Sequence, residues 1–261
     1  MNAGSSGLGS NGFWRILARF EPFMSLSTKT LIQDPLHKIS CLLAVLSGLL
    51  LALSFPKPGL SLLAWVAFVP LLRSVAGVTI RQAWKLGMIA GFTAYTGIVY
   101  WLVIVMNSYG KLPLFTSIPL MLLMAAYLPL YLAASVTLVR AGEIAGISCG
   151  ISFPLVWVGL EYLRSFALTG FPWASLGYSQ YKILPLIQIA DSVGVYGVSF
   201  LVALVNVALF RAILFFFNGE PLKNGIWTII AALVLMVATV AYGFQRLTTP
   251  ETGAPLKVAL I

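Results

Sequence analysis

Long apolar stretches with almost no charge dominate this sequence. Several of them approach or exceed the ~20 residues that an α-helix needs to cross the hydrocarbon core of a bilayer. Hydrophobic residues make up 60% of the 261 residues and charged residues 9%, whereas soluble domains typically carry about 45–50% and about 25%. A water-soluble fold of this length would lack the polar side chains that cover a surface. We therefore predict an all-α membrane protein.

The expected architecture is a bundle of about seven transmembrane helices, with an irregular aromatic-rich loop between the fifth and the sixth. The seven predicted spans are Ile39–Pro56, Leu60–Val75, Leu86–Gly110, Leu112–Val139, Ile144–Phe166, Val193–Phe217 and Gly225–Phe244. The chain then divides into a cytoplasmic tail (1–38), a transmembrane domain (39–245) and a polar linker that leads into a β-prone segment (246–261).

The tail of residues 1–38 differs in composition from the rest. It begins with a Gly/Ser-rich run, and it continues with Phe13 and Trp14 near Arg15 and Arg19. That mixture allows an amphipathic helix in the membrane interface. A tail without regular structure, or a true start at Met24, is the alternative that we favour.

The charge pattern fixes an expected orientation and excludes one class of partner. The net charge is +9, and the basic residues flank the apolar runs, where the positive-inside rule and anionic headgroups account for them. With the N-terminus in the cytoplasm, ten of the 16 Lys and Arg residues lie on the cytoplasmic side. Seven spans then bring the C-terminus to the periplasmic side. The sequence contains no basic stripe with interleaved aromatic residues, so we do not expect it to bind nucleic acid.

The residues needed for a complete catalytic site are lacking. Cys41 and Cys149 lie inside apolar runs, where burial makes a thiol unreactive. His37 is the single histidine, so neither a zinc site nor a serine triad can be assembled from this set. No GxxxxGK[ST] phosphate loop occurs. We expect no catalytic residue, no metal and no cofactor.

The uncharged segment 165–181 is the strongest candidate for a binding site. Glycine and proline interrupt it, so a regular spanning helix is not expected, and aromatic and hydroxyl residues fill it. Irregular backbone at membrane depth is tolerated only where protein covers it. Two interpretations stay open: an opening for a lipid headgroup or acyl chain, or an aromatic belt that only anchors the bundle. The candidate substrate-binding residues are Phe171, Pro172, Trp173, Gly177, Tyr178 and Gln180.

Three further features have mainly structural interpretations. Glu161 and Arg164 share a helix face, and we favour an ion pair near the outer helix end over a functional intramembrane carboxylate. The GxxxG patterns at 87–91 and 146–150 predict close helix packing. Asp191 stands where an N-cap or first-turn acid belongs.

Several motifs together resemble a known family. They are Leu-Ser-Phe-Pro at 53–56, Leu-Ala-Trp at 63–65, Val-Pro-Leu-Leu at 69–72, Gly-Phe-Pro-Trp at 170–173, Leu-Gly-Tyr-Ser-Gln at 176–180, Gln-Ile-Ala-Asp at 188–191 and the run at 194–200. This set resembles the apolipoprotein N-acyltransferases. The similarity begins near Ile39 and continues to Val-Ala-Leu-Ile at 258–261, which is similar to the first strand of that family's nitrilase-like domain.

The resemblance implies a fold and an activity. Seven helices would precede a periplasmic nitrilase-like domain and a final helix, in the inner membrane of a bacterium. The enzyme would act as a monomer and move an acyl chain from a phospholipid, typically phosphatidylethanolamine, to the N-terminal diacylglyceryl-cysteine of an apolipoprotein. A Glu-Lys-Cys triad would carry this chemistry through a thioester. Both the phospholipid donor and the apolipoprotein acceptor are thus expected partners.

The sequence departs from that pattern at its end. It stops within the β-prone segment, where the nitrilase-like domain of the family begins, so no triad residue can be carried over. We expect this chain alone to be inactive. The alternatives are a transporter, which would require ionisable groups within the helices and internal repeats, and a non-catalytic membrane scaffold.

Overall fold

The computed structural model describes residues 38–221, 223 and 225–249. These residues are entirely helical apart from turns and loops, with no β-strand among them, so the predicted all-α class is confirmed for this part of the chain. The expectations for the tail before residue 38, including Met24 as a start, and for the β-prone segment 250–261 lie outside the described residues.

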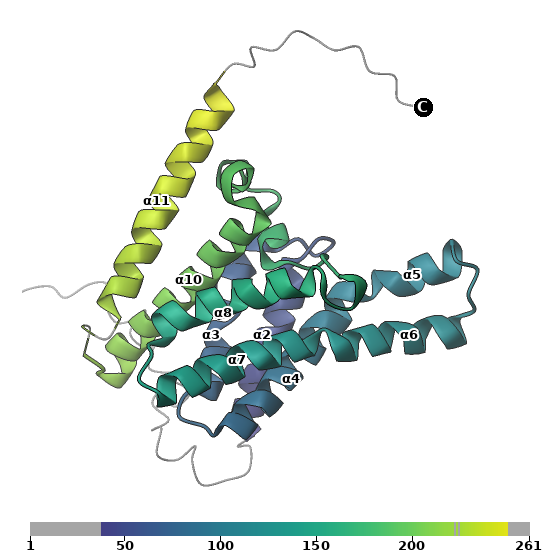
Figure 1. The fold of residues 1–261 in the computed structure, drawn as a ribbon, viewed down its shortest axis with the longest axis horizontal. Helices are drawn as coiled ribbons and strands as arrows, with labels where there is room; N and C mark the ends of the chain where they lie inside the picture. The colour runs from purple at the N-terminus through teal and green to yellow at the C-terminus, as the bar shows by residue number, and fades with distance from the viewer. Residues whose placement is uncertain (1–37, 222, 224, 250–261) are drawn as a thin grey trace, which may run out of the picture.

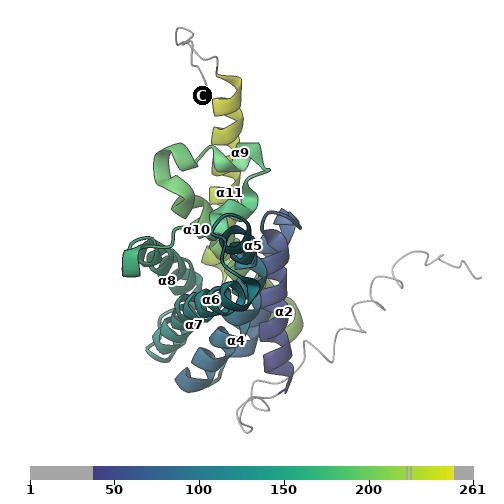
Figure 2. The same ribbon diagram turned by 90° about the vertical axis from the view of Figure 1, so that its right-hand side faces the viewer.

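Nine α-helices of seven or more residues and several short helical turns make up the described part. In chain order they are α2 (Lys38–Ser54), η1 (Ser61–Trp65), α3 (Val69–Val75), α4 (Ile80–Val99), α5 (Trp101–Ser108), α6 (Leu114–Tyr127), α7 (Pro129–Ile144), α8 (Cys149–Arg164), η2 (Ala167–Thr169), η3 (Leu176–Gln180), α9 (Leu184–Ile187), α10 (Ala190–Asn218) and α11 (Ile226–Thr248). Helices α2, α3, α4, α7, α8 and α10 form the body of the bundle. The α5–α6 hairpin and α11 project from it (Figures 1 and 2).

Three helical segments of the described chain are long and apolar enough to cross a membrane: Leu114–Ile144, α10 and α11. A fourth follows if α4 and α5, which meet at a bend of 41°, form one span. The helix Lys38–Ser54 and the segment Ser61–Val75 are apolar but shorter.

Glycines allow the central helices to approach closely. An ideal Cβ at Gly87 would lie 2.5 Å from the Cα of Ala133 on α7, and one at Gly91 would lie 2.8 Å from the Cα of Pro129. The GxxxG pattern at 87–91 therefore packs α4 onto α7, as predicted. The pattern at 146–150 does not form such a pair, because Gly146 lies in the loop before α8 with φ +86°, where an ideal Cβ would meet nothing within 4 Å.

The predicted continuous helix Leu60–Val75 is wrong. The chain forms η1, breaks at residues 66–68 and resumes as α3. Buried Asn206 of α10 supplies partners at the break: its Oδ1 accepts from Phe68 N at 2.8 Å, and its Nδ2 donates to Ala64 O at 2.8 Å. An interrupted backbone inside a membrane bundle needs such partners because water is excluded. One amide side chain thus stabilises the break.

Helix α11 is joined to the bundle along one side only. Near its C-terminal end, Arg246 Nε lies 3.1 Å from Asp191 Oδ2, and the Tyr242 hydroxyl donates to the same oxygen at 2.7 Å. Asp191 is a first-turn acid of α10, as predicted, but its side chain forms no N-cap hydrogen bond. Instead it joins α10 to α11. Helix α10 itself is kinked at Gly194, where φ is +64°.

Candidate functional site

The segment between α8 and α9 has an irregular backbone. It contains η2 and η3, and φ is positive at Leu168 (+50°), Gly170 (+85°) and Ala174 (+62°). An ideal Cβ at Gly170 would collide with the carbonyl oxygen of Ser165, so glycine is required there. The turn at Gly170 carries the next residues back over the end of α8, where Phe171 N donates to Arg164 O at 3.0 Å.

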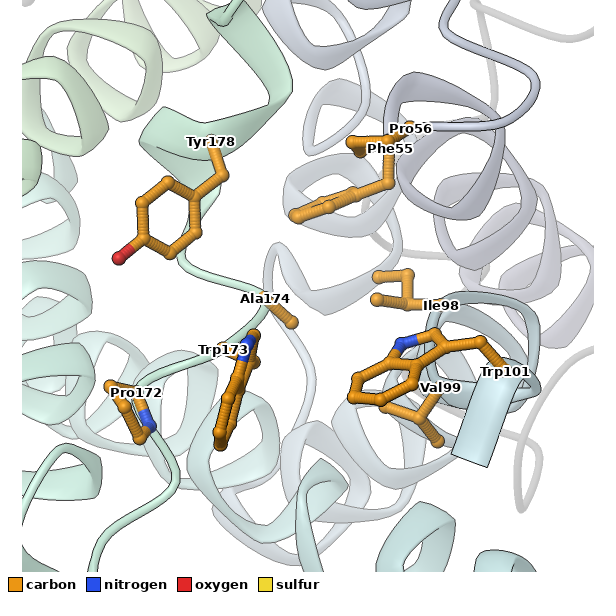
Figure 3. Close-up of a pocket in the computed structure, with 9 residues that line it drawn as sticks. All are labelled: Phe55, Pro56, Ile98, Val99, Trp101, Pro172, Trp173, Ala174 and Tyr178. Atoms are coloured by element: carbon orange, nitrogen blue, oxygen red, sulfur yellow. The ribbon is translucent and has the colours of Figure 1, made fainter. Parts of the chain in front are cut away.

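This segment forms one wall of an apolar cavity of about 540 Å³. The opposite wall comes from the end of α2 and from the junction of α4 with α5 (Figure 3). The lining residues are Phe55, Pro56, Ile98, Val99, Trp101, Pro172, Trp173, Ala174 and Tyr178. The rings of Trp101 and Trp173 approach from opposite walls, with centroids 6.3 Å apart. We call this space the aromatic cavity.

The six candidate substrate-binding residues fall into two groups. Pro172, Trp173 and Tyr178 line the aromatic cavity. The other three are buried around it and do not line it: Phe171, Gly177 and Gln180. The volume of the cavity lies in the range of pockets that hold small molecules, about 300–1,000 Å³.

The three buried candidates attach the segment to neighbouring helices. Phe171 packs among side chains of α4 and α6. Gly177 N donates to Ser199 Oγ of α10 at 2.9 Å. Gln180 connects the segment to η1, because its Oε1 accepts from Trp65 Nε1 at 2.9 Å and its Nε2 donates to Ser61 O at 3.1 Å.

Glu161 and Arg164 do not form the predicted ion pair. The ion pairs of the described residues are Arg140–Glu143, Arg211–Glu220 and Arg246–Asp191. Glu161, 4% exposed, accepts from Leu176 N at 2.6 Å, and Arg164, 1% exposed, donates to the Tyr95 hydroxyl at 2.8 Å. Each side chain has therefore turned to a different neighbour. Glu161 supports η3, while Arg164 joins α8 to α4.

Sequence reasoning missed the half of the cavity that comes from α2, α4 and α5. Phe55 and Pro56 belong to the Leu-Ser-Phe-Pro motif, which offered a signal. Ile98 and Trp101 carried none, because they are apolar residues in an apolar run. The buried hydroxyl of Tyr95 was missed for the same reason.

The aromatic cavity has no lining residue that could act as a nucleophile, apart from the phenol of Tyr178. Cys149 begins α8, so about 24 Å of helix separates it from the segment that follows Arg164. Cys41 likewise lies in the first turn of α2, and Phe55 follows that helix's other end. Among the described residues, no group of three or more His, Cys, Asp or Glu could hold a metal. The arrangement suits binding of an apolar chain.

These features define a class: an α-helical membrane protein with an apolar, aromatic-lined cavity. Comparison with known proteins narrows the class to one family. The apolipoprotein N-acyltransferase N-terminal domain matches residues 47–208. The chain belongs to the apolipoprotein N-acyltransferase family.

Curated relatives support the assignment. The apolipoprotein N-acyltransferase of Geobacter metallireducens is 56% identical over 228 residues, which cover 87% of this chain and 44% of that protein. Those of Photobacterium profundum and Methylococcus capsulatus are each 30% identical, over 84% of this chain and 41% and 43% of their own lengths. The chain thus spans less than half the length of the curated relatives it matches.

Proposed function

We propose that this chain forms the membrane part of a phospholipid:apolipoprotein N-acyltransferase in the bacterial inner membrane. The observation that carries the proposal is the aromatic cavity, whose lining residues all lie within the stretch 47–208 that matches the family. Its donor would be a phospholipid and its acceptor the N-terminal diacylglyceryl-cysteine of an apolipoprotein. No cofactor takes part, and the protein acts as a monomer.

In this proposal the aromatic cavity holds an acyl chain. Pro172, Trp173 and Tyr178 contact the chain from one side, and the rings of Phe55 and Trp101 contact it from the other. Burial of each methylene in such a site contributes about 0.8 kcal/mol. The remaining candidates, Phe171, Gly177 and Gln180, act by holding the segment in place. Their hydrogen bonds and packing support that role.

The acyl transfer would be covalent catalysis by a Glu-Lys-Cys triad of a nitrilase-like domain. Glu takes the thiol proton, the thiolate attacks the ester carbonyl of the phospholipid, and the lysophospholipid leaves as an alcohol. The amine of the acceptor then attacks the thioester, which gives the amide and restores the thiol. We infer that neither Cys41 nor Cys149 is this thiol, because each lies at the other end of its helix from the aromatic cavity.

We further propose seven membrane spans within residues 39–245, with the N-terminus in the cytoplasm. The longer spans would be Leu114–Ile144, α10, α11 and the bent pair α4–α5. Three shorter segments would complete the seven: α2, Ser61–Val75 and α8. The basic side chains at the end of the bundle opposite the aromatic cavity support this orientation. They are Arg73, Arg81, Lys85, Arg140, Arg211 and Lys223.

The proposal can be tested with a chimera. The matching part of the Geobacter metallireducens relative is replaced by the 228 aligned residues of this chain. Acylation of a diacylglyceryl-cysteine peptide is then measured with a phospholipid donor. We expect the chimera to be active and this chain alone to be inactive. Turnover by this chain alone would disprove the location of the triad, and an inactive chimera at normal membrane levels would disprove the function.

The aromatic cavity is tested in the same chimera by Trp173→Ala. Trp173 is 57% exposed, so truncation removes a partly buried ring, and kcat/KM should fall about tenfold, which equals ~1.4 kcal/mol of transition-state stabilisation. The matched control is Phe216→Ala, because Phe216 is a 75% exposed aromatic residue that does not line the aromatic cavity. Equal activity of both variants would mean that the segment only anchors the bundle.

A further inference from the structure

A second cavity system lies at the other end of α8. An apolar groove of about 570 Å³ runs between α8, α10 and α11. Its apolar walls include Ile151 and Leu155 from α8, Leu204 from α10, and Trp227 and Ala231 from α11. The groove faces outward from the bundle and, in a membrane, would open to the acyl chains.

A polar cavity of about 500 Å³ adjoins the apolar groove, and Ser148 lines both. Arg140, Glu143, Arg211 and Glu220 line the polar cavity. Together the two spaces are amphiphilic: one part is apolar and long, and the other carries charged groups.

Each of the two spaces is lined by a basic side chain that could bind an anion, Arg211 in the polar cavity and Lys223 in the apolar groove. Arg211 Nε is buried and has no hydrogen-bond partner among the described residues, and the Arg211–Glu220 contact is long, at 3.7 Å. Lys223 lines the apolar groove and is exposed. It lies two residues before Gly225, where an ideal Cβ would be 2.7 Å from Cβ of Arg211. Arg211 therefore packs against the backbone at Gly225, two residues along the chain from Lys223.

The contacts of α11 with the bundle leave a space that an occupant would fill. Near its C-terminal end, α11 is joined to the bundle through Arg246 and Tyr242, which both contact Asp191. Near its N-terminal end, α11 packs on Leu204 and Ala208 of α10 through Ala232, and Thr228 makes close contact with Gly150 of α8, while the apolar groove beside them is open. An acyl chain in the groove would fill the space between α8 and α11.

We propose that these adjoining cavities form a second phospholipid site, distinct from the aromatic cavity. One acyl chain lies in the groove between α8 and α11, and the phosphate lies against Lys223 and Arg211. The site binds its lipid without reacting with it, and the bound lipid fixes α11 to the bundle. A phosphodiester anion next to an apolar chain matches the charge and the shape of the two spaces.

The test is photolabelling of the 261-residue chain in detergent, using a phospholipid with a diazirine in its acyl chain. Labelled peptides are mapped with and without excess unlabelled phospholipid. We expect competitor-sensitive labelling of the peptides that contain Ile151, Leu204 and Trp227. Labelling that excess lipid does not reduce, or that is spread evenly around α11, would show only bulk lipid contact and overturn the proposal.

Matched variants locate the site. Ala231→Trp fills the groove and should abolish the competitor-sensitive labelling, whereas Leu233→Trp, on a 62% exposed position that does not line the groove, should leave it unchanged. Lys223→Gln, at an exposed residue that can be replaced without disturbing the fold, should weaken binding about fivefold. Lys111→Gln at the α5–α6 tip is its control. Unchanged labelling in Lys223→Gln and Ala231→Trp would contradict the proposal.

Discussion

The two ends of α8 hold their polar side chains in different ways. We call the end at Arg164 the aromatic end and the end at Cys149 the basic end. Both adjoin irregular backbone and a cavity, but at the aromatic end the backbone is held by buried polar side chains that each face a different element, Glu161 toward η3 and Arg164 toward Tyr95. At the basic end the charged groups pair with one another, as in Arg140–Glu143, and remain partly exposed. The aromatic end thus uses buried groups to contact two other elements, while the charged groups of the basic end are more exposed, although Arg140 Nε also donates to Val78 O at 2.6 Å.

Substitutions at the two ends of α8 should therefore differ in whether they affect stability or lipid binding. Buried polar groups are costly to leave without partners, so changes at the aromatic end should lower stability as well as function. Partly exposed ion pairs contribute less, so loss of such a pair at the basic end should alter lipid binding more than stability. Three substitutions test this difference, beginning with the one expected to have the largest effect.

Glu161→Ala should give the largest loss of stability. It removes the acceptor of Leu176 N and leaves that buried donor without a partner, so the free energy of unfolding should fall by about 3 kcal/mol. SDS-titration unfolding followed by circular dichroism measures the change. Glu143→Ala is the control at the basic end, with an expected loss of about 0.5 kcal/mol. Similar losses for both variants would remove the contrast between the two ends.

Asn206→Leu comes next. The change removes both partners of the break between η1 and α3, Phe68 N and Ala64 O, and should cost about 2 kcal/mol in the same unfolding measurement. Asn107→Leu, whose amide bonds Leu112 O on the exposed hairpin, should cost much less. If Asn206→Leu unfolds like the wild type, polar bonding does not hold this break.

Gly177→Ala should have the smallest effect of the three. A methyl group there would lie 2.6 Å from Val195 O, so α10 or the segment between α8 and α9 must shift, at a cost of about 1 kcal/mol. Gly159→Ala provides a matched control on α8, because a methyl group there meets nothing within 4 Å. A stable Gly177→Ala protein with an unchanged aromatic cavity would show that the close approach to α10 is not required.

The sequence predicted some of these features because they have local causes. Apolar runs identified α10 and α11, and Gly170 and Pro172 identified an irregular segment, since each reflects backbone rules that act within a few residues. The GxxxG at 87–91 succeeded for the same reason. The one at 146–150 failed because Gly146 terminates a turn instead of continuing a helix face.

Other features depend on contacts between distant residues. The break at 66–68 requires Asn206, 138 residues from Phe68, and a single amide in an apolar run gives no sign of its partner. The spacing of Glu161 and Arg164 correctly placed them on one face, but their choice of partners was decided by η3 and by Tyr95 of α4. The wall of the aromatic cavity formed by α2, α4 and α5 was missed because it too depends on contacts between distant residues.

The binding of a lipid by the aromatic cavity is the central claim, and native mass spectrometry of the purified chain tests it most directly. Protein released from micelles that contain phospholipid should retain bound lipid. Trp173→Ala should retain one phospholipid fewer than the wild type, and Phe216→Ala should match the wild type. Equal retention by wild type and Trp173→Ala would contradict an acyl-chain site at the aromatic cavity.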